Sequence, residues 1–301
     1  MMTHISLGFC EADITPAAPN DALAPAYASL VDACILDAAR RALAAMRPVR
    51  IAWGCAETNI GVNRRNGGAL DRRAACFSQA WGCPVMLTQG AAGNVAPRFF
   101  CSKINPPDAD DTSGRFVRTD DALNEMGRAV LWDTQALFDS LRPHEAASLR
   151  VYTARGTLYS GVPTPSRART IAAEAAREAG IDGGGWLKEL ARLNEAGITR
   201  QSERVELQYF HLDEGALIGV PNEIMCELAL NVRAQCGDLF FPGGYTNGCT
   251  GYLHTAEEYD RGGYEVFWSM LNYYMYFGRV MPLERDSAAR LVQMAVQGLR
   301  G

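Results

Sequence analysis

Histidine is scarce in this sequence, with only 4 among the 301 residues. None of the four has the HExxH or HxH spacing that is typical of histidine-based metal sites. The nine cysteines include no C-x-x-C pair, which argues against a zinc knuckle and against a disulfide scaffold. An odd number of scattered thiols favours a reducing compartment, so we expect a cytoplasmic protein.

Long apolar runs and a positive charge excess are also absent. No run approaches the roughly 20 apolar residues of a membrane span. The first residues, MMTHISLGFCEADITP, lack the basic start and apolar stretch of a signal peptide. The net charge of −5, from 29 basic and 34 acidic residues, does not indicate the basic surface that binds nucleic acid. A hydrophobic content of 48% and a charged content of 21% are those of an ordinary globular protein.

Apolar periodicity predicts that strands and helices alternate along the chain. Strands are expected over residues 5–16, 49–55, 84–89, 148–159, 204–212 and 216–220. Helices are expected over residues 27–46, 70–81, 121–141, 165–179, 186–196 and 286–299. With no internal repeat, this order predicts one layered α/β domain over residues 1–301, a mixed β-sheet flanked by helices.

The stretch 216–265 is the most informative part of the sequence. Its apolar start, 216–220, predicts a buried strand, and Asn222 is a good N-cap for a following helix. Glu223 is therefore expected in the first turn of a helix, just past a strand, where ligand chemistry tends to collect. It could be a metal ligand or a general base. A carboxylate there is also favourable to the helix dipole alone, so both interpretations stay open.

The loop that follows is rich in Gly, Tyr, Asn and Thr. Tyr252 and Tyr264 could donate to an oxyanion or coordinate a metal, although loop tyrosines more often pack locally. His254 follows Tyr252 by two residues and would point to the same side of an extended chain. Asn247 is a candidate substrate contact in the same loop. A catalytic zinc ion needs three protein ligands, and the sequence offers Glu223, Tyr252 and His254.

Two further motifs are candidates for ligand binding. In QGAAGNVAP (89–97), Gly90 and Gly93 would let backbone N–H groups approach a ligand closely, with Asn94 beside them. A tight turn between a strand and a loop is the simpler interpretation. Arg64, in the Asn-Arg-Arg loop, could clamp an anionic or carbonyl group, but arginines on loops are usually solvated.

Taken in order, five motifs resemble those of one family: GFCEADITP, NRR, QGAAGNVAP, VPNE and GYTNGCTGYLHTAEEYDRGGYE. The chain looks like the N-terminal catalytic domain of the neutral/alkaline non-lysosomal ceramidases and their shorter bacterial relatives. The resemblance implies their α/β fold in shortened form, without the immunoglobulin-like C-terminal domain. It also implies zinc-dependent hydrolysis of an N-acyl amide such as an N-acylated sphingoid base. Glu223 and Tyr252 would then bind zinc, Tyr264 would stabilise the oxyanion and Arg64 would contact the substrate.

The sequence departs from the family at both zinc histidines. DITPAAPNDALAPAYASLV and NRRNGGALDRRAACFSQAWG stand where the histidine-bearing segments are expected, and neither contains histidine. His254, alone or with Cys249, would have to complete the metal site. Three hypotheses follow: a zinc-dependent N-acyl amide hydrolase, an inactive relative that binds a small acylated or polar ligand, or a shortened remnant that self-associates.

Overall fold

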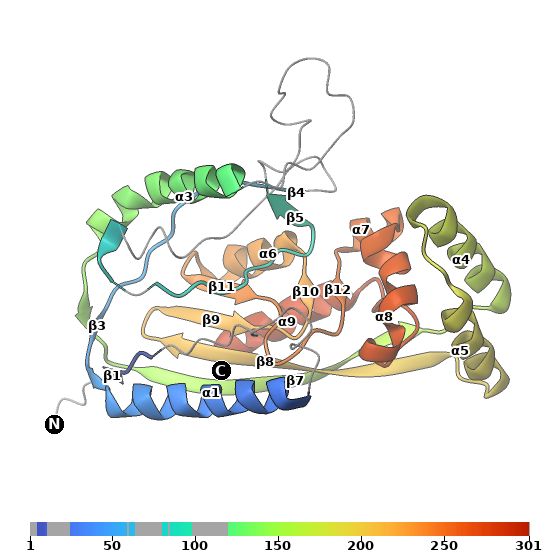
Figure 1. Ribbon diagram of the computed structural model, residues 1–301, viewed down its shortest axis with the longest axis horizontal. Helices are drawn as coiled ribbons and strands as arrows, with labels where there is room; N and C mark the ends of the chain where they lie inside the picture. Colours follow the sequence, from blue (N-terminus) through green and yellow to red (C-terminus); the bar gives the residue numbers. More distant parts are fainter. Residues whose placement is uncertain are drawn as a thin grey trace, which may run out of the picture. The chain divides into compact units, whose positions relative to one another are not determined.

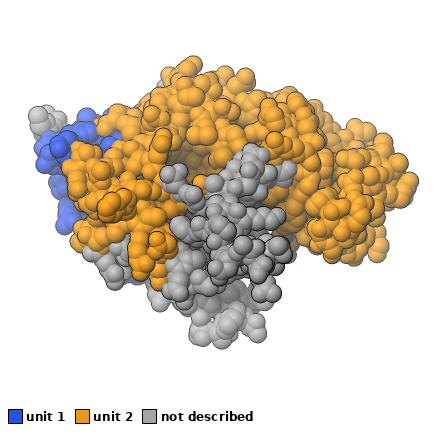
Figure 2. All heavy atoms as spheres, turned by 90° about the horizontal axis from the view of Figure 1, so that it is seen from above, with its two compact units in different colours: residues 1–53, 141–149 blue, residues 54–140, 150–301 orange. Residues whose placement is uncertain are grey.

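The computed structural model describes residues 5–10, 25–58, 60–63, 80–83, 85–97 and 120–300 (Figure 1). The chain forms two compact units, coloured separately in Figure 2. The smaller unit spans residues 1–53 and 141–149, and the larger spans residues 54–140 and 150–301. That the whole chain acts as one domain stays a prediction. None of the described helices is long and apolar enough to cross a membrane.

The smaller unit contains one long helix and two short antiparallel strand pairs. The helix is α1 (Pro25–Ala44), which confirms the helix predicted over 27–46. The strand pairs are β1 (Ser6–Leu7) with β2 (Arg47–Pro48), and β3 (Arg50–Ile51) with β6 (His144–Glu145). The strands predicted over 5–16 and 49–55 are thus paired over two residues each in the part of the chain that the structure describes.

The larger unit is built on a four-stranded mixed sheet. In spatial order its strands are β11 (Phe240–Gly243), β9 (Gly215–Gly219), β8 (Arg200–Leu212) and β7 (Leu149–Gly161). Strand β9 runs antiparallel to β8 and parallel to β11. Asp213, with a left-handed φ of 49°, forms the tight turn between β8 and β9 that its sequence predicts. The expected α/β class with a mixed sheet is confirmed.

The two faces of this sheet differ because side chains alternate along each strand. On the inward face, Leu207 and Tyr209 are fully buried, and their cluster includes residues of two helices. These helices are α6 (Cys226–Cys236) and α9 (Ser287–Arg300), the second confirming the predicted C-terminal helix. On the outward face, Phe210 and Leu217 are opposite one another and remain partly exposed.

A second core lies among helices. It joins α4 (Pro165–Ala179), α5 (Gly184–Glu195), the π-helix η3 (Tyr264–Trp268) and α8 (Ser269–Phe277). Helix α7 (Ala256–Arg261) precedes η3. Trp186 is buried there, and its indole N–H donates to the Val280 carbonyl at 2.7 Å. Thr164 caps α4 and Gly180 ends it with φ 65°, both as the sequence predicts.

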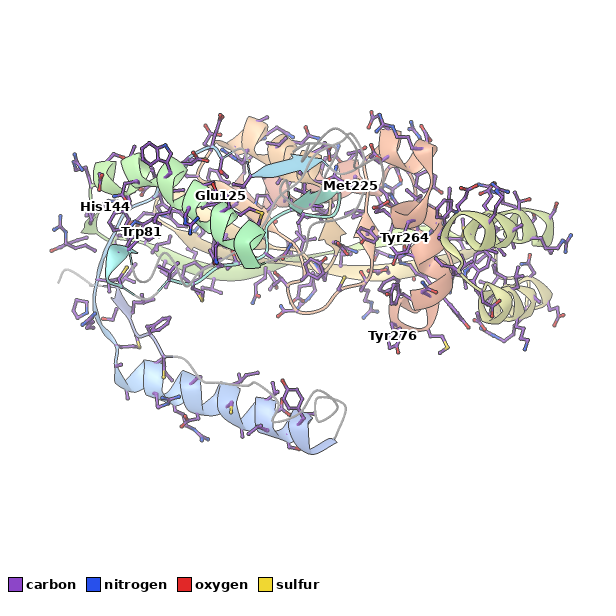
Figure 3. The ribbon with its side chains drawn as sticks, turned by 45° about the horizontal axis from the view of Figure 1, so that its top comes forward. Trp81, Glu125, His144, Met225, Tyr264 and Tyr276 are labelled. Carbon is purple, nitrogen blue, oxygen red and sulfur yellow. The ribbon has the colours of Figure 1, made fainter. Side chains whose placement is uncertain are left out.

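Two further pieces belong to the larger unit. Helix α3 (Asp120–Ser140) confirms the prediction over 121–141. The ring of its Phe138 stacks on Trp81, which is labelled in Figure 3, with the ring centroids 4.7 Å apart. Strands β4 (Gly61–Asn63) and β5 (Val95–Pro97) pair antiparallel.

Two predictions before α3 have different outcomes. The strand predicted over 84–89 is wrong, because described residues 85–90 form a loop whose backbone makes tertiary contacts, such as Gly244 N–H donating to the Gly90 carbonyl. The helix predicted over 70–81 lies mostly outside the described residues.

We expect Leu207→Ala to lower the free energy of unfolding by about 2–5 kcal/mol, because it removes a fully buried side chain from the inward face. Leu217→Ala is the matched control on the outward face and should cost less than about 1 kcal/mol. Urea denaturation of both variants measures the difference. Equal losses would contradict this assignment of the two faces.

Candidate functional site

Glu223 and Tyr252 lie side by side in the structure. Strand β10 (Glu223–Ile224) pairs in parallel with β12 (Tyr252–Leu253), and Glu223 is in register with Tyr252. The Glu223 N–H donates to the Gly251 carbonyl at 3.0 Å, and the Met225 N–H donates to the Leu253 carbonyl at 3.1 Å. Pairing between two strands that lie nearly thirty residues apart in the sequence therefore brings together the two residues that the family resemblance selected.

The local structure around Glu223 differs from the prediction. Glu223 is in a strand, and helix α6 begins at Cys226 with Met225 as its N-cap. Asn222 is therefore not a helix cap. Its buried amide instead donates to the Thr250 hydroxyl at 2.8 Å. Pairing with β12 satisfies the backbone here, so the non-local contact overrides the local capping signal.

Two more tyrosines surround the Glu223 carboxylate. The Tyr245 hydroxyl hydrogen-bonds to Glu223. The pKa of Tyr245 is raised mainly by burial, and further by this hydrogen bond and by the negative charge of Glu223. Burial also raises the pKa of Tyr264, with contributions from Tyr273 and from the Glu223 charge. We call Glu223, Tyr245, Tyr252 and Tyr264 the phenol cluster. Tyr245 was not among the predicted site residues, because no local signal predicts its left-handed φ of 60°.

The glycine-rich turn contacts β10 directly. The Gly93 N–H donates to the Ile224 carbonyl at 2.8 Å, and a Cβ on Gly93 would lie 2.6 Å from the Glu223 carbonyl oxygen. The close approach that glycine allows is thus made to the protein's own strand. The Gly90 carbonyl accepts from Gly244, which attaches the same turn to the loop after β11. The tight-turn interpretation accounts for Gly93, and ligand binding by Gly90 and Gly93 stays a prediction.

Asn94 acts as a helix cap from a distant segment. Its side chain is fully buried, and its Oδ1 accepts from the Cys226 N–H at 2.9 Å, at the start of α6. Its Nδ2 donates to both carboxylate oxygens of Glu227, at 2.9 and 2.8 Å. Both ends of the amide are therefore engaged within the protein. A role for Asn94 in substrate binding stays a prediction.

The remaining candidates lie in different surroundings. Asn247, with φ 58°, is exposed and donates to the Gln208 side chain at 3.1 Å. His254 is 2% exposed, and its ring meets that of Tyr259 edge-on with centroids 5.5 Å apart. Arg64 lies outside the described residues. Substrate contact by Asn247 and catalysis by Arg64 stay predictions.

The described side chains do not place three His, Cys, Asp or Glu ligands for a catalytic zinc ion around Glu223, and zinc binding by Glu223, Tyr252 and His254 stays a prediction. Such an ion takes three protein ligands, usually with imidazole or thiolate among them. Within the described ranges, no group of three His, Cys, Asp or Glu side chains with ligand atoms within 4.8 Å of one another includes Glu223. Burial raises the pKa of the Cys249 thiol. His211 is engaged elsewhere, with its Nδ1 3.0 Å from the guanidinium of Arg150.

A buried arginine holds the loop that carries Tyr252. Arg279, between α8 and α9, is 1% exposed at its side chain and pairs with Glu203 of β8 at 2.6 Å. Its guanidinium also donates to the carbonyls of Met281 and Thr250. The Thr250 hydroxyl in turn donates to the Pro221 carbonyl at 3.1 Å. A continuous set of polar contacts therefore runs from the sheet through this loop to the start of β10.

Comparison with known proteins supports the fold. No protein-family model and no curated protein matches the sequence. The crystal structure of neutral ceramidase from Pseudomonas aeruginosa matches with a TM-score of 0.52 at 16% identity, over 91% of this chain and 56% of that one. A structure of ceramidase complexed with C2 matches with a TM-score of 0.51 at 17% identity, over 91% and 57%. The predicted resemblance is confirmed at the level of the fold, and this chain spans a little over half the length of those chains.

We expect Gly93→Ala to destabilise the protein by about 1–3 kcal/mol, because its Cβ would meet the backbone of β10. Gly90→Ala is the matched control, since a Cβ there meets nothing within 4 Å. Chemical denaturation of the two variants gives the comparison. A Gly93→Ala protein as stable as Gly90→Ala would show that the turn does not pack on β10.

Arg279→Met should lower the free energy of unfolding by about 3–5 kcal/mol, because it leaves Glu203 buried without its charge partner. Arg285→Met is the control. It removes a pair with Asp260 whose side chains are both more than half exposed, so the unfolding midpoint should change far less. Similar midpoints for the two variants would refute the role given to Arg279.

Proposed function

We propose that this chain, which shares the fold of neutral ceramidase, is a catalytically inactive relative that binds a small polar or acylated ligand at the phenol cluster. The observation that carries the proposal is the hydrogen bond from Tyr245 to the Glu223 carboxylate. It engages the carboxylate with a phenol from a neighbouring loop. A zinc ion bound to Glu223 would have to compete with that phenol.

The chemistry of the cluster suits hydrogen-bonded recognition. A phenol hydroxyl both donates and accepts, whereas an ionised carboxylate only accepts. Burial raises the pKa of Tyr245 and Tyr264, which keeps both phenols protonated near neutral pH. An N-acyl amide matches this set, because its N–H can donate to the carboxylate and its C=O can accept from a phenol. This match supports an acylated amine or a similar small polar molecule as the ligand.

Zinc-dependent hydrolysis of an N-acyl amide is the second candidate. It is favoured by the ceramidase fold and by the adjacent positions of Glu223 and Tyr252. The donors available to Glu223 count against it, since zinc sites without nitrogen or sulfur ligands are weak. Self-association is the third candidate. It is favoured by β7, a 13-residue strand at one edge of the described sheet.

Metal content separates the first two candidates. We expect protein purified without a chelator to contain far less than one zinc ion per chain, and EDTA to leave its melting temperature unchanged. N-octanoylethanolamine should raise the melting temperature in a saturable way without releasing octanoate. Glu223→Gln should abolish that rise, and Glu257→Gln, at an exposed carboxylate on α7, should retain it.

The rival outcomes are equally distinct. One zinc ion per chain, together with octanoate release that Glu223→Gln abolishes, would establish the hydrolase instead. No stabilisation by the amide and a melting temperature that rises with protein concentration would favour self-association.

A further inference from the structure

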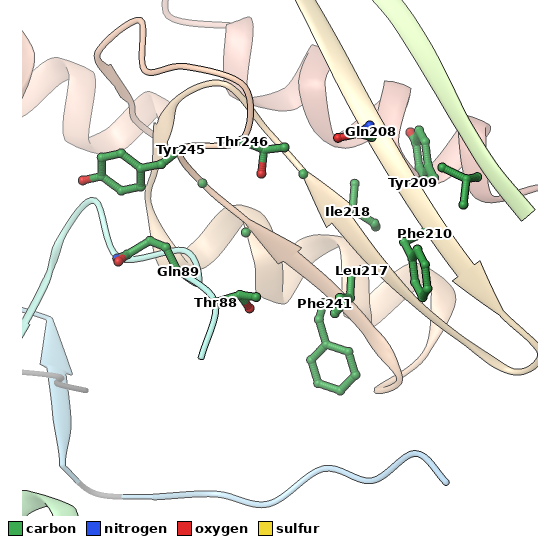
Figure 4. A pocket seen from close by; sticks show the side chains of 14 residues that line it. Thr88, Gln89, Gln208, Tyr209, Phe210, Leu217, Ile218, Phe241, Tyr245 and Thr246 are labelled. Atoms are coloured by element: carbon green, nitrogen blue, oxygen red, sulfur yellow. The ribbon is translucent and has the colours of Figure 1, made fainter. Parts of the chain in front are cut away.

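A cavity of about 500 Å³ lies over the outward face of the sheet (Figure 4). It is formed by β8, β9 and β11, by the loop just after β11, and by Thr88 and Gln89. Of the phenol cluster, Tyr245 is the one member that lines it, so the cavity lies beside that cluster and extends away from Glu223. Its volume is within the range of roughly 300–1,000 Å³ for pockets that bind small molecules.

The floor of the cavity is apolar. Phe210, Leu217 and Phe241 come from three adjacent strands, and the first two are in register across β8 and β9. Leu217 is also in register with Phe241 on β11. Phe210 is 37% exposed and Leu217 36% exposed. Apolar side chains that gather in a concave surface gain free energy when an apolar ligand covers them.

Two glutamines line the wall of the cavity. The side-chain oxygen of Gln89 is buried, so it is not accessible to a molecule in the cavity. The side-chain oxygen of Gln208 accepts from Asn247 at 3.1 Å. The apolar floor is therefore the part of the cavity that a ligand would cover.

Charge sets a further condition on the ligand. Among the described residues that line the cavity there is no Asp, Glu, Lys or Arg. An ionised ligand would lose its hydration there without gaining a charge partner, which is unfavourable. The polar groups of the wall are amides and hydroxyls, as on Gln89 and Thr246.

We propose that this cavity is a second binding site, for a neutral and mainly apolar small molecule. The apolar part of the ligand lies on Phe210, Leu217 and Phe241. The site adjoins the phenol cluster at Tyr245, and binding here does not depend on the function proposed for that cluster.

N-Phenyl-1-naphthylamine is a suitable probe, because it is neutral, apolar and fluorescent in apolar surroundings. We expect saturable binding of one probe per chain. Leu217→Glu should weaken binding at least tenfold by placing a charge in the floor. Leu230→Glu is the matched control, at a leucine of α6 that is 56% exposed outside the cavity, and should leave binding unchanged. Near-UV circular dichroism checks that both variants remain folded.

Undiminished binding in folded Leu217→Glu, or no saturable binding to the unmodified protein, would overturn the proposed site.

Discussion

The buried ion pair between Arg279 and Glu203 is the interaction on which the geometry of the candidate site depends. Removing two charges from water is costly, and burial alone lowers the pKa of Arg279 while Glu203 raises it. The planar guanidinium offsets that cost by donating in several directions at once, to the carboxylate and to two backbone carbonyls. Lysine, with a single ammonium group, lacks this planar set of donors. The contact therefore fixes the loop before β12, and so fixes Tyr252 relative to the sheet.

Glycines make the second constraint, because three chain segments interleave at the site. A Cβ on Gly93, Gly243 or Gly244 would meet backbone of a neighbouring segment within 2.6 Å. The segments are the turn at 89–93, the stretch around β10 and the loop after β11. Backbone that packs this closely needs residues without side chains. Packing of the fold therefore accounts for Gly93, Gly243 and Gly244 without a bound metal or ligand.

Structural features that depend on neighbouring residues could be predicted from the sequence, and features that depend on contacts between distant residues could not. The cap of α4 at Thr164 and the turn at Asp213 follow from local preferences, and the structure has both. The cap predicted at Asn222 was wrong because β10 pairs with β12, which local sequence does not encode. Tyr245 was missed for the same reason, since its importance comes from the carboxylate it reaches. The order of the motifs was informative about the fold, whereas the chemistry depends on which donors converge in space.

The direction of the Tyr264 side chain depends on the number of residues between it and α8, because a π-helix begins at Tyr264. A π-helix holds more residues per turn than an α-helix, and η3 continues directly into α8. Because each residue of an α-helix turns the chain by about 100°, deleting one residue between Tyr264 and α8 would rotate the phenol away from Glu223. Every side chain at the site could then be retained while the cluster was lost. For this segment the spacing of residues is as strict a requirement as their identity.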